Sequence, residues 1–186
     1  GNDACYESLV LSCGGNLLRN DLRIRLGAAG AQAKVGGVYL ANRSQHVDHT
    51  TLIEHAEPNT TSSQLFKGAL NEKARGVFQG NIIVRKGADG SNGHLDNRIL
   101  LLSPGAEANS KPQLEIYADD VKCSHGSTIG ELDEEAMFYL RSRGISENQA
   151  KSILIKGFLS EVIEQFDLRE LLEIFNDRIG DWMRAS

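Results

Sequence analysis

The residues of this chain best suited to chemistry are Cys123 and His125, which lie two positions apart in the segment Lys122-Cys123-Ser124-His125-Gly126. The segment has the pattern of an extended strand, in which alternate side chains point to the same face. At ~3.3 Å per residue, the two Cα atoms are expected about 6.6 Å apart. A thiolate and an imidazole suit zinc or iron–sulfur chemistry better than magnesium or calcium. The pair is therefore a candidate metal site.

This candidate metal site is incomplete on its own. Two ligands are half of the tetrahedral set that zinc takes, so we expect any metal here to take further donors from elsewhere. In the alternative interpretation, Cys123 shares a face with Val121 and is a small hydrophobic residue inside the fold. Buried cysteines are usually inert, and the residues taken alone favour this second interpretation.

A second group of potential metal ligands comprises His46, His49 and His55, with Asp48 and Glu54 between them. On a strand, His49 and His55 would share one face while His46 would point to the other. The three imidazoles then do not converge on one ion. We therefore predict a structural role for them, in which the rings stack or form hydrogen bonds inside the fold.

Length and composition bound the possible classes of protein. A chain of 186 residues can form one hydrophobic core, or one core with a small appendage. It has no apolar run of the roughly 18 residues that span a bilayer, so no membrane partner is expected. The odd count of three cysteines argues against a disulfide scaffold. It favours a reducing compartment, and a bacterial cytoplasm or a plastid stroma would fit.

The net charge of −5 is unevenly distributed. From Glu131 onwards there are 12 acidic and 7 basic residues, whereas the 13 acidic and 13 basic residues before it cancel. The chain has no basic stripe that could release counterions from phosphates, so nucleic acid is not an expected partner. The acidic tail is interpreted as a solvated helix surface, with docking on a basic partner as the alternative.

Up to about Thr128 the chain is rich in glycine and its apolar residues fall in short β-branched runs. Turn formers separate these runs, among them Gly36-Gly37 and Pro58-Asn59. This pattern predicts an all-β body, for which a sandwich, a barrel and a β-solenoid all fit. Very short strands and irregular connections favour the solenoid, although no clean repeat is visible. The expected strands lie at residues 22–26, 38–40, 50–53, 77–78, 82–85, 99–102 and 114–117.

After Thr128 the apolar spacing becomes helical. Asp133 is predicted to cap a helix that runs through Leu140 and is ended by Gly144. Ser146 and Gln149 form a capping box for a second helix to residue 166.

Asp167 and Glu170 repeat the capping box for a third helix to about Met183. This last helix presents one apolar stripe to a core. The stripe consists of Leu168, Leu171, Leu172, Phe175, Ile179 and Trp182.

Several motifs, taken in order, resemble the C-terminal portion of the SufD subunits of the SufB–SufC–SufD iron–sulfur cluster assembly complex, which belong to the SufB/SufD family. The resemblance covers roughly residues 22–183. The motifs are residues 46–55 with Pro58, Gln64 and Lys67, then 76–80 with Asn97, 100–103, 114–126, Leu132-Asp133 and 138–145.

The resemblance implies a right-handed parallel β-helix over residues 1–130, followed by a three-helix domain over residues 131–186. It also implies that the N-terminal helical region and the early coils of the family are missing. We therefore expect this chain to be a fragment of a longer protein.

The resemblance further implies a non-catalytic scaffold for cluster assembly that pairs with a SufB-like subunit. Cys123 and His125 would contribute to a transient iron or iron–sulfur cluster completed by that partner, with no tightly bound cofactor in this chain. In this view the helical domain docks a SufC-like ATPase. The partner-binding candidates are Asp133, Phe138, Tyr139, Phe158 and Phe175.

Two alternatives stay open, and the second belongs to another class of function. One is a SufB-like sister subunit, whose own cysteine-containing segments are not matched here. The other is a β-helix enzyme acting on carbohydrate, which would need spaced carboxylates and exposed aromatic residues along the solenoid. Most of the large aromatic residues instead fall in the helical tail. The sequence has no G-x-x-x-x-G-K-[ST], G-x-S-x-G or H-E-x-x-H motif, which favours a scaffold over an enzyme.

Overall fold

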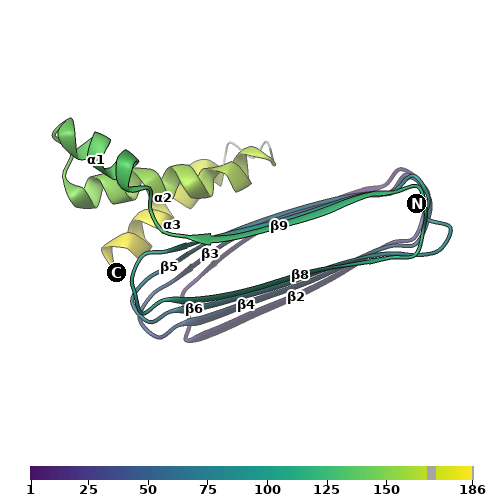
Figure 1. The fold of residues 1–186 in the computed structure, drawn as a ribbon, viewed down its shortest axis with the longest axis horizontal. Helices are drawn as coiled ribbons and strands as arrows, with labels where there is room; N and C mark the ends of the chain where they lie inside the picture. Colours follow the sequence, from purple (N-terminus) through teal and green to yellow (C-terminus); the bar gives the residue numbers. More distant parts are fainter. Residues whose placement is uncertain (167–170, 186) are drawn as a thin grey trace.

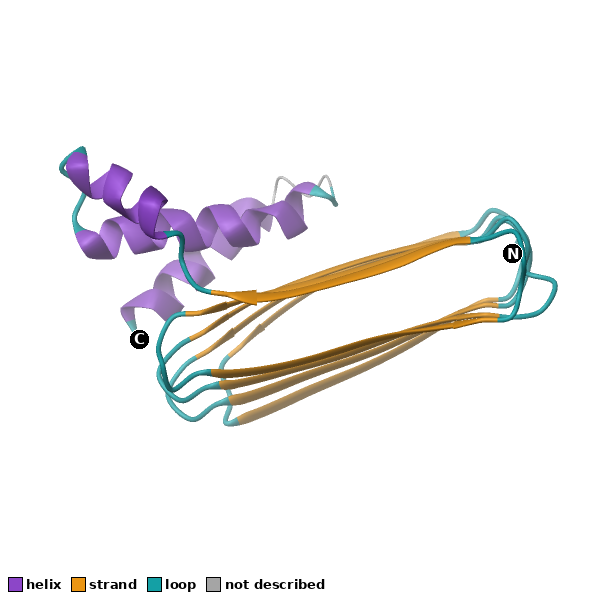
Figure 2. Cartoon of the chain, in the orientation of Figure 1, coloured by secondary structure: helices purple, strands orange, loops and turns teal. Residues whose placement is uncertain are grey.

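The computed structural model describes residues 1–166 and 171–185 of the chain. Within these residues, nine strands form an elongated β-helix, and three helices follow them and gather at one end (Figure 1). Figure 2 shows the same division by secondary structure, with the strands running along the long sides of each flattened coil. The strands are β1 (Cys5–Cys13), β2 (Leu17–Leu26), β3 (Gln32–Ala41), β4 (His46–His55), β5 (Thr61–Leu70), β6 (Arg75–Val84), β7 (Asn92–Leu101), β8 (Glu107–Ile116) and β9 (Lys122–Gly130).

The strands form two parallel sheets. Sheet A has the order β1-β3-β5-β7-β9, and sheet B has the order β2-β4-β6-β8. Each strand therefore pairs with the next strand but one, and the chain alternates between the sheets as it winds. A sandwich built from hairpins would instead pair consecutive strands in antiparallel fashion. The predicted β-solenoid is confirmed.

The solenoid has a regular spacing that the sequence reading missed. Successive strands of sheet A begin 27 to 31 residues apart, and those of sheet B begin 29 to 32 residues apart. The strands are also longer than expected, at nine or ten residues each. The expectation of very short strands was wrong because the β-branched runs mark only part of each strand. Polar residues on the outward face complete it.

Strand β4 shows how the core is built. Its inward residues Val47, His49, Thr51, Ile53 and His55 are buried, and the residues between them are half-buried. This strict alternation follows from the two-residue period of a strand. The inward side chains of successive coils pack into one core that runs through the β-helix.

Gly36 and Gly37 do not form the predicted turn, because they lie within β3. A Cβ atom at Gly37 would overlap the Phe66 ring inside the β-helix, and one at Gly36 would overlap the Phe166 ring outside it. The two glycines therefore allow large aromatic rings to approach both faces of the strand.

The first helix has the predicted ends. In α1 (Glu134–Ser142), the Asp133 carboxylate accepts hydrogen bonds from the backbone N–H groups of Glu135 and Ala136, at 2.8 and 3.2 Å. The helix is followed by Gly144, whose φ of 85° is the left-handed conformation that ends many helices.

The second helix, α2 (Glu147–Glu164), begins with the predicted capping box of Ser146 and Gln149. It has no basic residue in its last turn. The sequence also predicted a cap for the third helix at Asp167 and Glu170, and these residues lie outside the described part of the chain.

The third helix, α3 (Leu171–Arg184), buries Phe175, Ile179 and Trp182 of the predicted stripe. Leu171 was also predicted to face the core, but it lies in the first turn and is exposed. Leu168 lies outside the described residues. A second apolar core forms where α2 and α3 pack on the outer face of sheet A. The residues of this second core are Val38, Leu40, Leu65, Ala69, Ile155, Leu159, Val162, Ile163, Phe166, Phe175, Ile179 and Trp182.

None of the described helices is both long and apolar enough to cross a membrane.

Candidate functional site

Cys123 and His125 lie on β9, the last strand of sheet A. One edge of β9 pairs with β7, which places Cys123 opposite Gly93 and His125 opposite Leu95. Among the described residues, no strand pairs with the other edge of β9. Leu95 belongs to the inner core, so Cys123 and His125 both project from the inward face. The prediction that they share one face of a strand is confirmed.

The two side chains differ in exposure because no further described coil covers β9. Cys123 is half-buried and packs against the inner core, whereas His125 is exposed. Burial raises the pKa of the Cys123 thiol, and a hydrogen bond with the Gly93 backbone opposes the rise. Since a metal binds the thiolate, an incoming ion must displace the thiol proton.

The pair supplies two donors at most. Over residues 1–166 and 171–185, no group of three or more His, Cys, Asp and Glu side chains is arranged to hold a metal ion. A tetrahedral site takes four ligands. Ligation at Cys123 and His125 by these residues alone would therefore leave an ion half coordinated.

Apolar side chains are exposed near β9, at the end of the stack of coils. We call residues 107–130, which comprise β8, β9 and their connection, the end coil. Ile116, Tyr117 and Ile129 of the end coil are all exposed. β8 and β9 are also the last strands of their sheets within the described residues. The end coil thus combines unpaired strand edges with apolar side chains.

The histidines of β4 have a structural placement, as predicted. His49 and His55 point inward and are buried, whereas His46 points outward and is half-buried. The His49 ring lies between the rings of Tyr39 and Phe66, with centroid distances of 5.3 and 5.4 Å. This stack excludes water from the imidazole.

Hydrogen bonds hold His55 inside the β-helix. Its Nδ1 atom lies 2.9 Å from Oγ1 of Thr60, and its Nε2 atom lies 2.8 Å from Oγ of Ser62. Burial lowers the pKa of His55 and of His49 from 6.5 to about 4, because a dry interior disfavours the imidazolium. Both rings are neutral at pH 7 and are buried in the core.

The helical candidates for partner binding fall into two groups. Phe138 and Tyr139 of α1 are 75% and 57% exposed, and Asp133 caps the same helix. Phe175 is buried in the second apolar core, and Phe158 packs against that core. The structure therefore places Phe158 and Phe175 within the helical domain and Phe138 and Tyr139 on its surface.

Sequence reasoning gave no role to an ionic cluster between α2 and sheet A. It contains Lys67, Arg98, Asp96 and Glu161. Lys67 is only 2% exposed, which is rare for a lysine. Its position in an otherwise apolar run, between Leu65-Phe66 and Ala69-Leu70, was the available signal.

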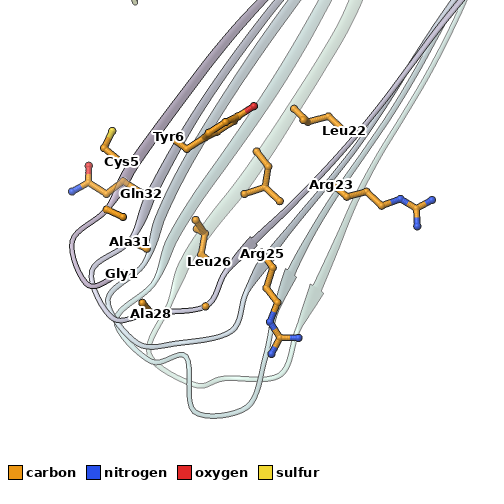
Figure 3. Close-up of a pocket in the computed structure, with 13 residues that line it drawn as sticks. Gly1, Cys5, Tyr6, Leu22, Arg23, Arg25, Leu26, Ala28, Ala31 and Gln32 are labelled. Carbon is orange, nitrogen blue, oxygen red and sulfur yellow. The ribbon is translucent and has the colours of Figure 1, made fainter.

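A cavity of about 580 Å³ lies at the opposite end of the stack, between β1 and β2 (Figure 3). Leu22 and Leu26 line its inner side, and the Arg23 and Arg25 side chains point away from it. Its lining contains no histidine or carboxylate. The cavity offers no acid–base pair. It is also remote from Cys123 and His125, because β1 and β9 lie at opposite edges of sheet A.

Residues 1–158 match the family described as "SUF system FeS cluster assembly, SufBD core domain". The chain belongs to this SufBD family. It is 38% identical over 178 residues to the iron–sulfur cluster assembly protein SufD of Escherichia coli, with 96% of this chain and 42% of that protein covered.

Two further relatives come from other lineages. A SufBD family protein of Mycobacterium leprae is 35% identical over 181 residues, covering 93% of this chain and 46% of the relative. The chloroplastic protein ABCI7 of Arabidopsis thaliana is 37% identical over 167 residues, covering 89% and 35%. The SufBD chain spans less than half the length of these curated relatives.

Proposed function

We propose that this SufBD chain is a non-catalytic scaffold subunit for iron–sulfur cluster assembly. The observation that carries the proposal is the position of Cys123 and His125 on the inward face of an end strand, in a chain of the SufBD family. In this function iron and the nascent cluster are cargo. They are held briefly by these two side chains and by ligands from a partner.

The incomplete donor set supports a transient role. A thiolate and an imidazole can hold iron without enclosing it, because two of four positions are left for other ligands. The exposed imidazole of His125 is accessible to those ligands, and the half-buried thiol of Cys123 lies on the same face. A site shared between two subunits can also release its cluster when the subunits move apart.

The end coil supports pairing with a second, SufB-like β-helix subunit. The free edges of β8 and β9 offer backbone N–H and C=O groups to another strand, which is the usual mode of strand addition. Ile116, Tyr117 and Ile129 add exposed apolar area. Pairing at this edge would bring the partner's ligands next to Cys123 and His125.

Helix α1 supports docking of a SufC-like ATPase. Phe138 and Tyr139 are exposed beside the acidic residues Glu134 and Glu135, and all four line one surface groove. Exposed aromatic residues flanked by charge are typical of protein interfaces. The sequence itself has no phosphate-binding P-loop, so ATP hydrolysis is assigned to the partner.

The test is to co-express the chain with a SufB-like and a SufC-like subunit and to purify the complex without oxygen. Iron and acid-labile sulfide per complex are then compared for the wild type, Cys123→Ala and His125→Ala. Cys13→Ala and His46→Ala are the matched controls, since Cys13 is an exposed cysteine of β1 and His46 points outward from β4.

The proposal predicts that both end-coil variants form the complex. Their cluster content per complex should fall roughly tenfold, because one of four ligands is removed. The controls should keep the wild-type cluster content. Normal cluster content in Cys123→Ala and His125→Ala would reject the ligand role. Failure of the chain to bind either subunit would reject the scaffold role.

A further inference from the structure

Helix α2 is attached to sheet A by apolar contacts and by ionic contacts. The buried apolar residues of sheet A that pack against α2 and α3 lie on β3 and β5, namely Val38, Leu40, Leu65 and Ala69. The contacts from α2 towards β7 are ionic and centre on Glu161. Helix α2 therefore contacts β7 through the charged side chains of Glu161 and Arg98.

Lys67 forms the first part of the ionic contact. Its ammonium donates a hydrogen bond to the carbonyl of Phe158 at 2.8 Å and forms an ion pair with Glu161. It also lies 4.4 Å from the centroid of the Phe158 ring. A buried ammonium needs all these partners, because loss of its carboxylate would leave a charge in a dry environment.

Glu161 is shared between two cations. Its carboxylate also accepts hydrogen bonds from Nη1 of Arg98 on β7, at 3.3 and 3.4 Å. The hydrogen bond from Lys67 lowers the pKa of Glu161, so the side chain is ionised at neutral pH. One carboxylate of α2 thus joins β5 to β7.

Asp96 extends this contact to the end coil. Nε of Arg98 donates a hydrogen bond to its carboxylate at 2.8 Å. Asp96 is paired in register with Gly126 of β9, directly after His125. A Cβ atom on Gly126 would lie only 3.0 Å from Oδ1 of Asp96, so the carboxylate rests on the β9 backbone.

We propose that Glu161, Arg98 and Asp96 form a positioning relay that couples the placement of α2 to the conformation of β9, and so to the accessibility of Cys123. This deepens the proposed function, because it assigns residues that link the ATPase-docking helices to the cluster ligands. In the described part of the chain β9 pairs with one strand, so its conformation depends more on side-chain contacts than that of an inner strand.

The Cys123 thiol can report on this coupling without iron or partner subunits. We suggest measuring its alkylation rate with iodoacetamide in a Cys5→Ser/Cys13→Ser background, where it is the remaining thiol. Glu161→Gln breaks the contact at α2, and Asp96→Asn breaks it at β7. Each substitution keeps the size of the side chain and removes its charge.

Two control variants match these changes. Glu147→Gln removes an ion pair with Lys151 on the same helix, where the two atoms lie 2.8 Å apart. Asp21→Asn removes an aspartate that accepts from Arg23 two residues further along its strand, as Asp96 accepts from Arg98, but on sheet B. The controls therefore test the loss of a similar ion pair outside the relay.

The relay predicts that Glu161→Gln and Asp96→Asn each raise the alkylation rate by about threefold or more, through easier local opening of β9. Both controls should stay within about 1.5-fold of the parent rate. The relay also predicts that the double variant Asp96→Asn/Glu161→Gln reacts about as fast as the faster single variant. Unchanged rates, or effects that multiply in the double variant, would overturn the relay.

Thermal unfolding of each variant shows whether it folds. If Glu161→Gln loses the folded helical domain, Asp96→Asn still decides the question, because it leaves the Lys67–Glu161 pair intact. The alkylation rate is also independent of cluster assembly. A relay without a cluster role would change alkylation while Cys123→Ala leaves cluster content normal, and the opposite pattern would identify a ligand without a relay.

Discussion

Strands β4 and β9 carry the same kinds of side chain on the same face of the β-helix, yet their chemistry differs. β4 presents His49 and His55 inward, and β9 presents Cys123 and His125 inward. β4 lies between β2 and β6 in its sheet, whereas β9 pairs with β7 alone among the strands of residues 1–166 and 171–185. The number of covering coils therefore decides which inward residues are sealed and which are available.

This comparison shows how one solenoid can provide both a core and a binding surface. An inward polar residue in an inner coil must find its partners within the protein, as His55 does with Thr60 and Ser62. The inward residues of β9 are less covered, since Cys123 is half-buried and His125 is exposed. A second subunit that covers the end coil would then supply both the missing strand and the missing ligands.

The largest expected effect is a loss of stability in acid, caused by the buried histidines His49 and His55 of β4. Their pKa of about 4 lies below the value of 6.5 that the unfolded chain has. Between these pH values the unfolded state binds more protons, so the free energy of unfolding falls as pH falls through this window. Each histidine contributes about 3 kcal/mol to this loss at about 1.4 kcal/mol per pKa unit. Urea unfolding at pH 7 and at pH 4.5 measures it.

The variant His49→Phe should lose about half of this acid sensitivity, since a phenylalanine ring fits between Tyr39 and Phe66 and does not titrate. His46→Gln, on the outward face of β4, is its control and should keep the full sensitivity. If His49→Phe behaves like the control, His49 is not sealed in the way the structure shows.

The next effect compares two isoleucines that both face inward. Ile53 of β4 is fully buried, whereas Ile129 of β9 is 46% exposed. We expect Ile53→Ala to lower the free energy of unfolding by about 3 kcal/mol and Ile129→Ala by less than about 1 kcal/mol. Equilibrium unfolding in urea gives both values. Equal losses would show that the end coil is as well packed as the middle.

The smallest expected effect compares thiol access in the two strands. Thr51→Cys places a thiol on the inward face of β4, in a chain whose three natural cysteines are replaced by serine. It should react with iodoacetamide at least about 100-fold more slowly than Cys123 in the Cys5→Ser/Cys13→Ser chain, because access to β4 requires a larger opening. Similar rates for the two thiols would remove the distinction between inner and end strands.

The sequence was sufficient for the class of fold but not for its repeat. The change from two-residue to helical spacing after Thr128 identified the β body and the helices, and the caps at Asp133 and Ser146 were correct. The repeat was missed because corresponding positions of the coils differ in residue type. Gly93 and Cys123, for example, occupy one inward row. Only the register of hydrogen bonds makes that row visible.

The candidate site was predictable in composition but not in context. The pattern Cys-x-His placed both side chains on one face, and the resemblance to a family gave that face a function. The sequence could not show that β9 is an end strand, since this depends on which strands pair. It also could not show that Phe175 is buried while Phe138 is exposed, since both are aromatic residues of amphipathic helices.

The most direct test of the shared-site proposal is a pulsed electron paramagnetic resonance measurement on the reduced, cluster-loaded complex. The SufBD chain alone is labelled with ¹⁵N-histidine and combined with unlabelled SufB-like and SufC-like subunits. The proposal predicts a ¹⁵N hyperfine coupling to the cluster that persists in His46→Ala and is absent from the signal of the residual cluster in His125→Ala. A cluster without this coupling, or a coupling that survives in His125→Ala, would contradict it.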